Sequence, residues 1–132
     1  MRFLRPAAPY FQSLLRIVAG LLFLEHGTAK LLHFPHTAMA DHITLMSMMG
    51  AAGIIELVGG ALITAGLLTR FAAFIAAGEM AVAYWMVHVP MGGLLPLLNN
   101  GGEAILFCFV FLFLSAAGAG PVSVDAALGG GD

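Results

Sequence analysis

The sequence has few charged residues. Only 9% of its 132 residues are charged, whereas 61% are hydrophobic, and the mean hydropathy is +0.99. A water-soluble domain of this length has too little interior to bury so much apolar surface. The composition therefore excludes an ordinary soluble globular domain and predicts a protein surrounded by lipid.

Cysteine and basic residues are also scarce. The five Lys and Arg residues form no basic patch, so we expect no nucleic-acid partner. The single cysteine, Cys108, excludes an intramolecular disulfide and a CxxC redox motif. The sequence has no nucleophile pair, phosphate-binding loop or complete metal-ligand motif, and no haem, flavin or iron–sulfur signature. We therefore expect no intrinsic cofactor and no catalysis by the chain in isolation.

Long apolar stretches dominate the sequence instead. They cover residues 11–32, 51–68, 71–89 and 102–119, and each is close to the roughly 20 residues that cross a bilayer as a helix. Proline, glycine and polar residues separate them. The sequence thus predicts an all-α protein, an integral membrane four-helix transmembrane bundle that forms one domain over residues 1–132.

Arginine marks one end of the predicted bundle. Arg2, Arg5 and Arg16 flank or open the first stretch, and Arg70 follows the second, so four spans place them on one side. Because cytoplasmic segments carry an excess of Lys and Arg, that side is predicted to be cytoplasmic in the inner membrane, with both termini inside. This half of the bundle is expected to be apolar and to pack through small residues, since lipid provides no hydrophobic drive between helices.

Ionisable residues are embedded in these apolar stretches. They are Glu25, His26, Lys30, Glu56, Glu79, His88 and Glu103. A central charge costs about 2.5 to 3.5 kcal/mol on insertion scales, so these groups are expected to meet inside the bundle. At about 1.5 Å per residue, Lys30 and Glu56 both lie about 21 Å from the arginine end. The sequence therefore predicts a polar pocket in the outer half, with these seven residues as candidate ligand-binding or proton-relay groups.

Two aspects of these charges stay open. Lys30 can pair with Glu56 or Glu103, and such a pair can simply neutralise both charges and fix the packing of the helices. Glu79 lies near the middle of its stretch, where the carboxyl needs either a proton or a partner such as His26.

The first connection contains histidines and methionines. His33, His36 and His42 are weak candidates for metal ligands, and thioethers together with imidazoles suit copper(I). Methionine is also an adaptable apolar filler, so the same residues are compatible with simple packing.

Five short motifs occur in an order that is similar to one family. They are HGTAK at 26–30, ELVGG at 56–60, GLLTR at 66–70, NNGGE at 99–103 and GAGPVSVD at 118–125. With these motifs the chain resembles the DoxX family of small four-helix membrane proteins over nearly its whole length. The resemblance implies a bacterial inner-membrane protein linked to respiratory or oxidative-stress chemistry. Members of this family have been described as subunits of quinol oxidase and thiosulfate:quinone oxidoreductase. Others have been described as membrane anchors for superoxide dismutase and a sulfurtransferase.

Three functional hypotheses follow. The first is a redox-linked subunit whose pocket binds a quinone or a small redox partner, with Lys30 and His26 as donors and the carboxyl groups as proton relays. The second is a scaffold or assembly partner that recruits a soluble redox enzyme to the lipid bilayer. The third is the handling of copper or another metal. Catalysis as an accessory subunit of an oxidoreductase complex and assembly into a homo-oligomer both stay open.

Overall fold

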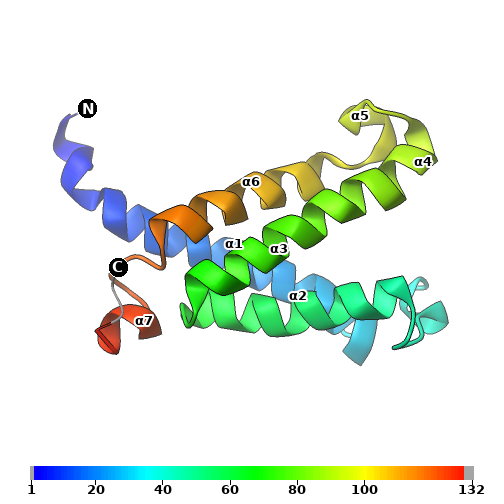
Figure 1. Cartoon of the computed structure of the whole chain (residues 1–132), viewed down its shortest axis with the longest axis horizontal. Coiled ribbons are helices and arrows are strands. Elements are labelled where there is room, and N and C mark those ends of the chain that lie inside the picture. The colour runs from blue at the N-terminus through cyan, green and yellow to red at the C-terminus, as the bar shows by residue number, and fades with distance from the viewer. Residues whose placement is uncertain (1, 130–132) are drawn as a thin grey trace.

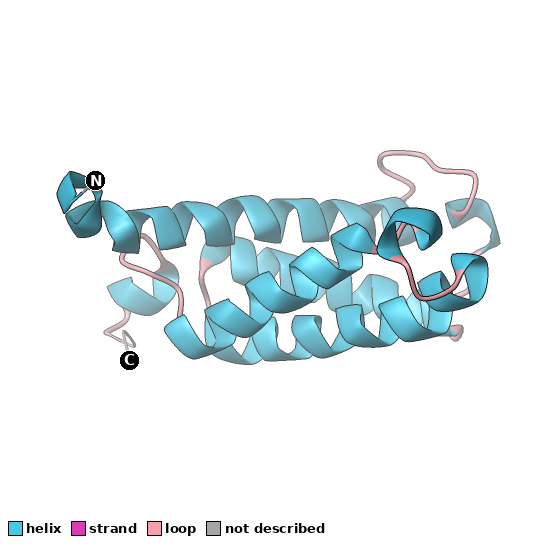
Figure 2. Ribbon diagram, turned by 90° about the horizontal axis from the view of Figure 1, so that it is seen from above, coloured by secondary structure: helices cyan, strands magenta, loops and turns pink. Residues whose placement is uncertain are grey.

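A computed structural model describes residues 2–129, which form helices joined by turns and loops. The bundle consists of α1 (Ala8–Leu32), α2 (Met48–Ala65), α3 (Thr69–Ala83) and α6 (Gly102–Ala117). These helices run alongside one another (Figure 1), and the view from above shows the same arrangement (Figure 2). The predicted all-α helical bundle is confirmed. We call the end that carries both described termini the proximal end, and the opposite end the distal end.

The apolar helices make the chain a multi-pass membrane protein. Within residues 2–129, the segments Arg2–Leu32, Met48–Ala65 and Thr69–Gly92 are long and apolar enough to cross a membrane. Helix α6 is also apolar but shorter, with 16 residues.

The second span begins and ends three residues earlier than predicted. It begins at Met48 because the Ser47 hydroxyl accepts a hydrogen bond from Gly50 N at 3.0 Å and so caps the helix. It ends at Ala65 because Gly66 adopts a left-handed conformation, with φ at 71°, which closes the last turn. The predicted range of 51–68 included this glycine because hydropathy alone does not register a helix cap.

The first and last spans also differ slightly from prediction. A short 3-10 helix, η1 (Arg2–Ala7), precedes α1, which begins at Ala8 rather than residue 11. Helix α6 ends at Ala117, two residues before the predicted end, where Gly118 has a φ of 86°. Apolar residues continue across both boundaries, so hydropathy does not mark these two helix ends.

The third span changes helix type near the distal end. Helix α3 continues into a π-helical turn, η3 (Tyr84–His88), and then into α4 (Val89–Gly92), and a short α5 (Pro96–Asn99) leads towards α6. Asn99 holds this connection together: its side chain donates to Gly93 O and accepts from Gly101 N, both at 2.7 Å. Single π-helical turns occur frequently at functional sites, and this one places His88 at the distal end of the bundle.

Glycine allows α1 and α2 to approach each other closely. A Cβ atom on Gly27 would lie 2.3 Å from Leu57 N, and one on Gly60 would lie 2.6 Å from Leu24 Cα. Small residues also bury one face of α3, because its alanines pack with the aromatic side chains of α6 in the core. The predicted packing through small residues is therefore confirmed.

Gly27→Ala is expected to lower the free energy of unfolding by about 2 kcal/mol, because the added methyl group has to push the α2 backbone away. Gly78→Ala is the matched control: no atom lies within 4 Å of its added Cβ, so stability should stay the same or rise slightly. Thermal unfolding in detergent micelles measures both effects. An equal loss in the two variants would contradict the close α1–α2 contact.

The proximal end contains a buried cation, so the prediction that this half is apolar is wrong. Arg16 is 1% exposed. Its Nε donates to Ala119 O at 2.8 Å, and its Nη1 donates to Ile63 O and Thr64 O at 2.7 and 2.5 Å. Its Nη2 donates to Val122 O. Because the last carbonyls of a helix carry the negative end of its dipole, the C-terminus of α2 stabilises the guanidinium.

Asp125 joins the C-terminal segment to the same end. It lies in α7 (Val124–Ala127) and accepts hydrogen bonds from Leu68 N and Thr69 N at 2.8 and 3.0 Å, which caps the start of α3. Its partial burial works to raise the pKa of Asp125, but these hydrogen bonds and the charge of Arg16 outweigh that effect and lower the pKa. The chain after α6 thus links α1, α2 and α3.

Candidate functional site

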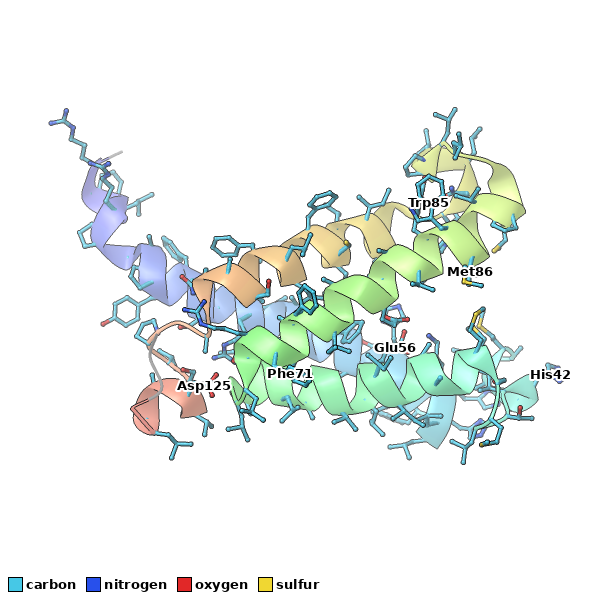
Figure 3. All side chains as sticks on the ribbon, viewed as in Figure 1. His42, Glu56, Phe71, Trp85, Met86 and Asp125 are labelled. Carbon is cyan, nitrogen blue, oxygen red and sulfur yellow. The ribbon has the colours of Figure 1, made fainter. Side chains whose placement is uncertain are left out.

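A pocket of about 570 Å³ lies in the distal half of the bundle. It is lined by all but one of the predicted site residues: His26, Lys30, Glu56, Glu79, His88 and Glu103. Glu25 is exposed and does not line this pocket. Figure 3 shows Glu56 between α2 and α3, and Met86 on the span that continues from α3.

Lys30 and Glu56 form an ion pair between α1 and α2. Lys30 Nζ donates to Glu56 Oε1 at 2.6 Å, and the two side chains are 16% and 1% exposed. Gly53 helps to place them, because the space for its missing Cβ is taken up by Leu31 and by Lys30 Cβ at 3.2 Å. The prediction that Lys30 and Glu56 lie at the same height is confirmed, and of the two partners considered for Lys30, the structure selects Glu56.

The second oxygen of each deep carboxyl group has no partner. Glu56 Oε2 and Glu79 Oε2 are buried and accept no hydrogen bond from any residue that the structure describes. Glu79 comes from α3 and Glu56 from α2, so the pocket has a carboxyl group on both of these walls. Buried polar atoms are nearly always paired with protein or water, so these two oxygens are available to a water, an ion or another bound molecule.

Two histidines are held by backbone carbonyl groups. His26 Nδ1 lies 2.9 Å from Leu22 O, and His88 Nδ1 lies 3.0 Å from Asn99 O. Since a carbonyl oxygen only accepts, Nδ1 is the donor in both contacts, and Nε2 of the neutral ring is an acceptor. His26 Nε2 faces Glu103 Oε1 at 3.9 Å. Between residues 2 and 129, the alternative pairing of His26 with Glu79 is not observed.

The rest of the pocket wall is apolar and rich in methionine. The methionines that line it are Met39, Met48, Met49, Met80, Met86 and Met91. On the α3 side, Ile75 and Val82 also line the pocket, although they are 41% and 50% exposed. Met48 on the α2 side is 51% exposed. The pocket lining is therefore exposed between α2 and α3, and also at the distal end, where Met39 and Met91 are 62% and 69% exposed. Figure 1 shows α2 and α3 separating towards the distal end.

Sequence reasoning missed this opening. It placed Met39, Met48 and Met49 in or near the first connection, whereas Met48 and Met49 form the first turn of α2. The available signal was the helical spacing of Ile75, Glu79, Val82 and Met86, which places apolar residues on the same face as a buried carboxyl group.

The candidate metal ligands do not converge on one site. His33 Nδ1 and His36 Nε2 lie 3.7 and 3.1 Å from Asp41 Oδ1, while His42 lies at the outer edge of the same connection (Figure 3). Across residues 2–129, no group of three or more His, Cys, Asp or Glu side chains is arranged to hold a metal ion.

The sequence pattern of the DoxX family matches residues 11–89 of the chain. The chain belongs to the DoxX family. The matched part of this DoxX protein includes Lys30, Glu56 and Glu79, and it ends before the helix that carries Glu103. An uncharacterized protein of Haemophilus influenzae is 43% identical over 120 residues, which cover 89% of this chain and 90% of that protein. No solved structure matches this DoxX protein significantly.

Proposed function

We propose that this DoxX-family membrane protein is a redox-linked subunit whose distal pocket binds a quinone. The observation that carries the proposal is the Lys30–Glu56 ion pair, with its unpaired carboxyl oxygen, in a largely apolar pocket whose lining is exposed between α2 and α3. A quinone combines a polar ring with a long apolar tail. The ring fits the polar part of the pocket, and the tail fits the opening between α2 and α3.

The polar residues have chemistry that suits a quinone ring. Lys30 uses one N–H on Glu56 and has two others that can donate to a ring carbonyl. The carboxyl groups of Glu79 and Glu103 line the same pocket and provide sites that can take up or release the protons of the ring. Flexible methionine side chains adapt to a tail that has many conformations. In this proposal the electrons come from a partner enzyme, so the chain acts as an accessory subunit of an oxidoreductase complex.

Lys30→Met combined with Glu56→Gln is expected to weaken quinone binding by about tenfold or more, because it removes the donor and the charged acceptor. The double variant is chosen because it leaves no buried charge alone. Isothermal titration calorimetry with decylubiquinone and nanodisc-embedded protein measures the affinity, with empty nanodiscs as baseline.

Glu25→Gln is the matched control for this experiment. It removes a carboxylate from α1 outside the pocket, so it should bind decylubiquinone as tightly as the wild type. If the double variant also bound as tightly as the wild type, the proposed site would be wrong.

We also propose that the proximal end faces the cytoplasm. Arg2 and Arg5 are exposed at that end, and Arg70 begins α3 there, whereas Lys30 lies in the distal half. Arg16 contributes less to this argument than the sequence suggested, because it is buried on carbonyl groups. A C-terminal green fluorescent protein fusion should fluoresce, and the matching alkaline phosphatase fusion should be inactive. An active phosphatase would show that the proximal end faces away from the cytoplasm and would contradict the proposed orientation.

A further inference from the structure

We infer that the distal pocket binds a lipid-soluble organic cation, an alkylammonium, in exchange for a proton of Glu79. The inference goes beyond the proposed function, because it concerns a different class of ligand and does not require that a quinone binds. It depends on the charge balance of the pocket. Lys30 already neutralises Glu56, so Glu79 is the deep carboxyl group that is left to balance a second cation.

Glu79 has no cation of its own. Within residues 2–129, no Lys, Arg or His side chain forms an ion pair with it, and its Oε2 is buried without a hydrogen-bond partner. A buried carboxylate without a cation is costly, so the empty pocket holds this carboxyl group in its protonated, neutral form. A cation that enters the pocket can be balanced by Glu79 once this proton has left.

Glu56 offers the cation a second contact. Its Oε1 accepts from Lys30 Nζ at 2.6 Å, whereas its Oε2 is buried without a partner on a side chain that is 1% exposed. Glu56 lies on α2 and Glu79 on α3, so the two carboxyl groups line the pocket from two walls. An ammonium group between these walls can donate one N–H to Glu56 Oε2 and another to Glu79. Two cations then alternate with two carboxylates, and the pocket gains no unbalanced charge.

The apolar lining of the pocket suits the alkyl chain of such a cation. Ile75 and Val82 lie near Glu79 on α3 and line the pocket while being 41% and 50% exposed, so a chain that leaves past them reaches the surface between α2 and α3. A small metal cation suits the pocket less well, because it prefers six or more oxygen ligands. Over the part of the chain that the structure describes, no group of three or more His, Cys, Asp or Glu side chains is arranged to hold a metal ion.

The exchange moves one proton and no electrons. The O–H bond of the Glu79 carboxyl group breaks, the proton passes to water, and the ammonium group takes its place as the counter-charge while keeping all of its own protons. Because one proton is released for each cation bound, the affinity rises with pH by up to about tenfold per pH unit while the empty pocket is protonated. Other titratable groups line the same pocket: Lys30 and His26 on α1, Glu56 on α2, His88 on η3 and Glu103 on α6. A variant of Glu79 therefore has to separate its proton from theirs.

The test is isothermal titration calorimetry of decylammonium into protein in phosphatidylcholine nanodiscs, with empty nanodiscs as baseline. The probe titrates near the pKa of lysine, about 10.4, so it stays charged between about pH 6 and about pH 8. Titrations in buffers with different ionisation enthalpies count the protons released. We expect about one proton per bound cation at about pH 6, and tighter binding at higher pH. Decan-1-ol has the same chain without the charge and should bind about tenfold or more weakly.

Glu79→Gln keeps the size of the side chain but removes the group that can ionise. This variant should release no proton and should bind decylammonium about tenfold or more weakly than the wild type. Its affinity for decan-1-ol should not change. Glu25→Gln removes a carboxylate outside the pocket and is the matched control, which should keep both the proton release and the affinity.

Four results would each overturn the inference: no binding of decylammonium, binding without proton release, equal affinity for decylammonium and decan-1-ol, or an unchanged proton count in Glu79→Gln. Thermal unfolding verifies the fold of each variant. If Glu79→Gln does not fold, the proton count and the comparison with decan-1-ol in the wild type still decide the question. None of these results bears on the proposed quinone site, which is tested separately with decylubiquinone.

Discussion

Arg16→Met is expected to lower the free energy of unfolding by about 3 to 5 kcal/mol, because it leaves several buried carbonyl groups unpaired while keeping a side chain of similar size. The guanidinium donates to the C-terminal carbonyls of α2 and to Ala119 and Val122 after α6. Its loss should therefore release the C-terminal segment and loosen the α1–α2 contact together. Chemical unfolding in micelles, followed by circular dichroism, measures the effect.

Two further variants define what Arg16 provides. Arg16→Lys keeps the charge but lacks the planar fork that reaches several carbonyl groups, so it should recover only part of the loss. Arg5→Met removes an exposed arginine from η1 at the same end and should be close to wild type in stability. The role assigned to Arg16 would be wrong if Arg16→Met and Arg5→Met had the same stability.

Lys30→Met has the second large expected effect, a loss of about 3 kcal/mol or more, because it leaves the carboxylate of Glu56 buried without its cation. Adding Glu56→Gln to Lys30→Met should restore much of this stability, since the double variant has no buried charge at the site. The measurement is a double-mutant cycle of unfolding free energies, and the expected coupling energy is about 1 kcal/mol or more.

Glu103 provides the control for this cycle. It lines the same pocket but is 61% exposed, and it faces His26 Nε2 at 3.9 Å rather than Lys30. Glu103→Gln should therefore give no recovery when it is combined with Lys30→Met. If Glu103→Gln restored as much stability to Lys30→Met as Glu56→Gln does, Lys30 would be stabilised by the overall charge of the pocket and not by Glu56 alone.

The bundle could be predicted from sequence because a bilayer imposes a length and an apolar composition on each span. The same regularity placed Lys30 and Glu56 at one height, since the rise of a helix is constant. Helix caps limited the accuracy at the ends of α2. Ser47 and Gly66 begin and end α2 through cap geometry, which an average of hydropathy over a window of residues does not detect.

The position of Glu25 shows what height alone leaves out. Glu25 lies next to His26 in α1, so the two residues have almost the same position along the helix axis. Each helical residue turns about 100° around that axis, however, so Glu25 points well away from the face shared by His26 and Lys30. The spacing rule that brought His26 and Lys30 together therefore already argued against Glu25. The structure places Glu25 outside the pocket, in agreement with this rotation.

The role of Arg16 could not be predicted from local pattern. Its partners are carbonyl groups of residues that lie 47 to 106 positions away in the chain, and backbone carbonyls carry no sequence signature. The sequence presented Arg16 as one more positive charge near a membrane boundary. Only the return of the C-terminal segment to α1 shows that it is a structural cation.

In the proposed function, a polar ring binds at the Lys30–Glu56 pair while its apolar tail leaves between α2 and α3. A crystal structure of the protein grown in a lipid phase with decylubiquinone tests this most directly. We predict density for the ring beside Lys30 and Glu56 Oε2, with the tail passing Val82 and Met48 towards lipid. Ring density elsewhere in the bundle, or a closed α2–α3 wall with only water beside Glu56, would contradict the account.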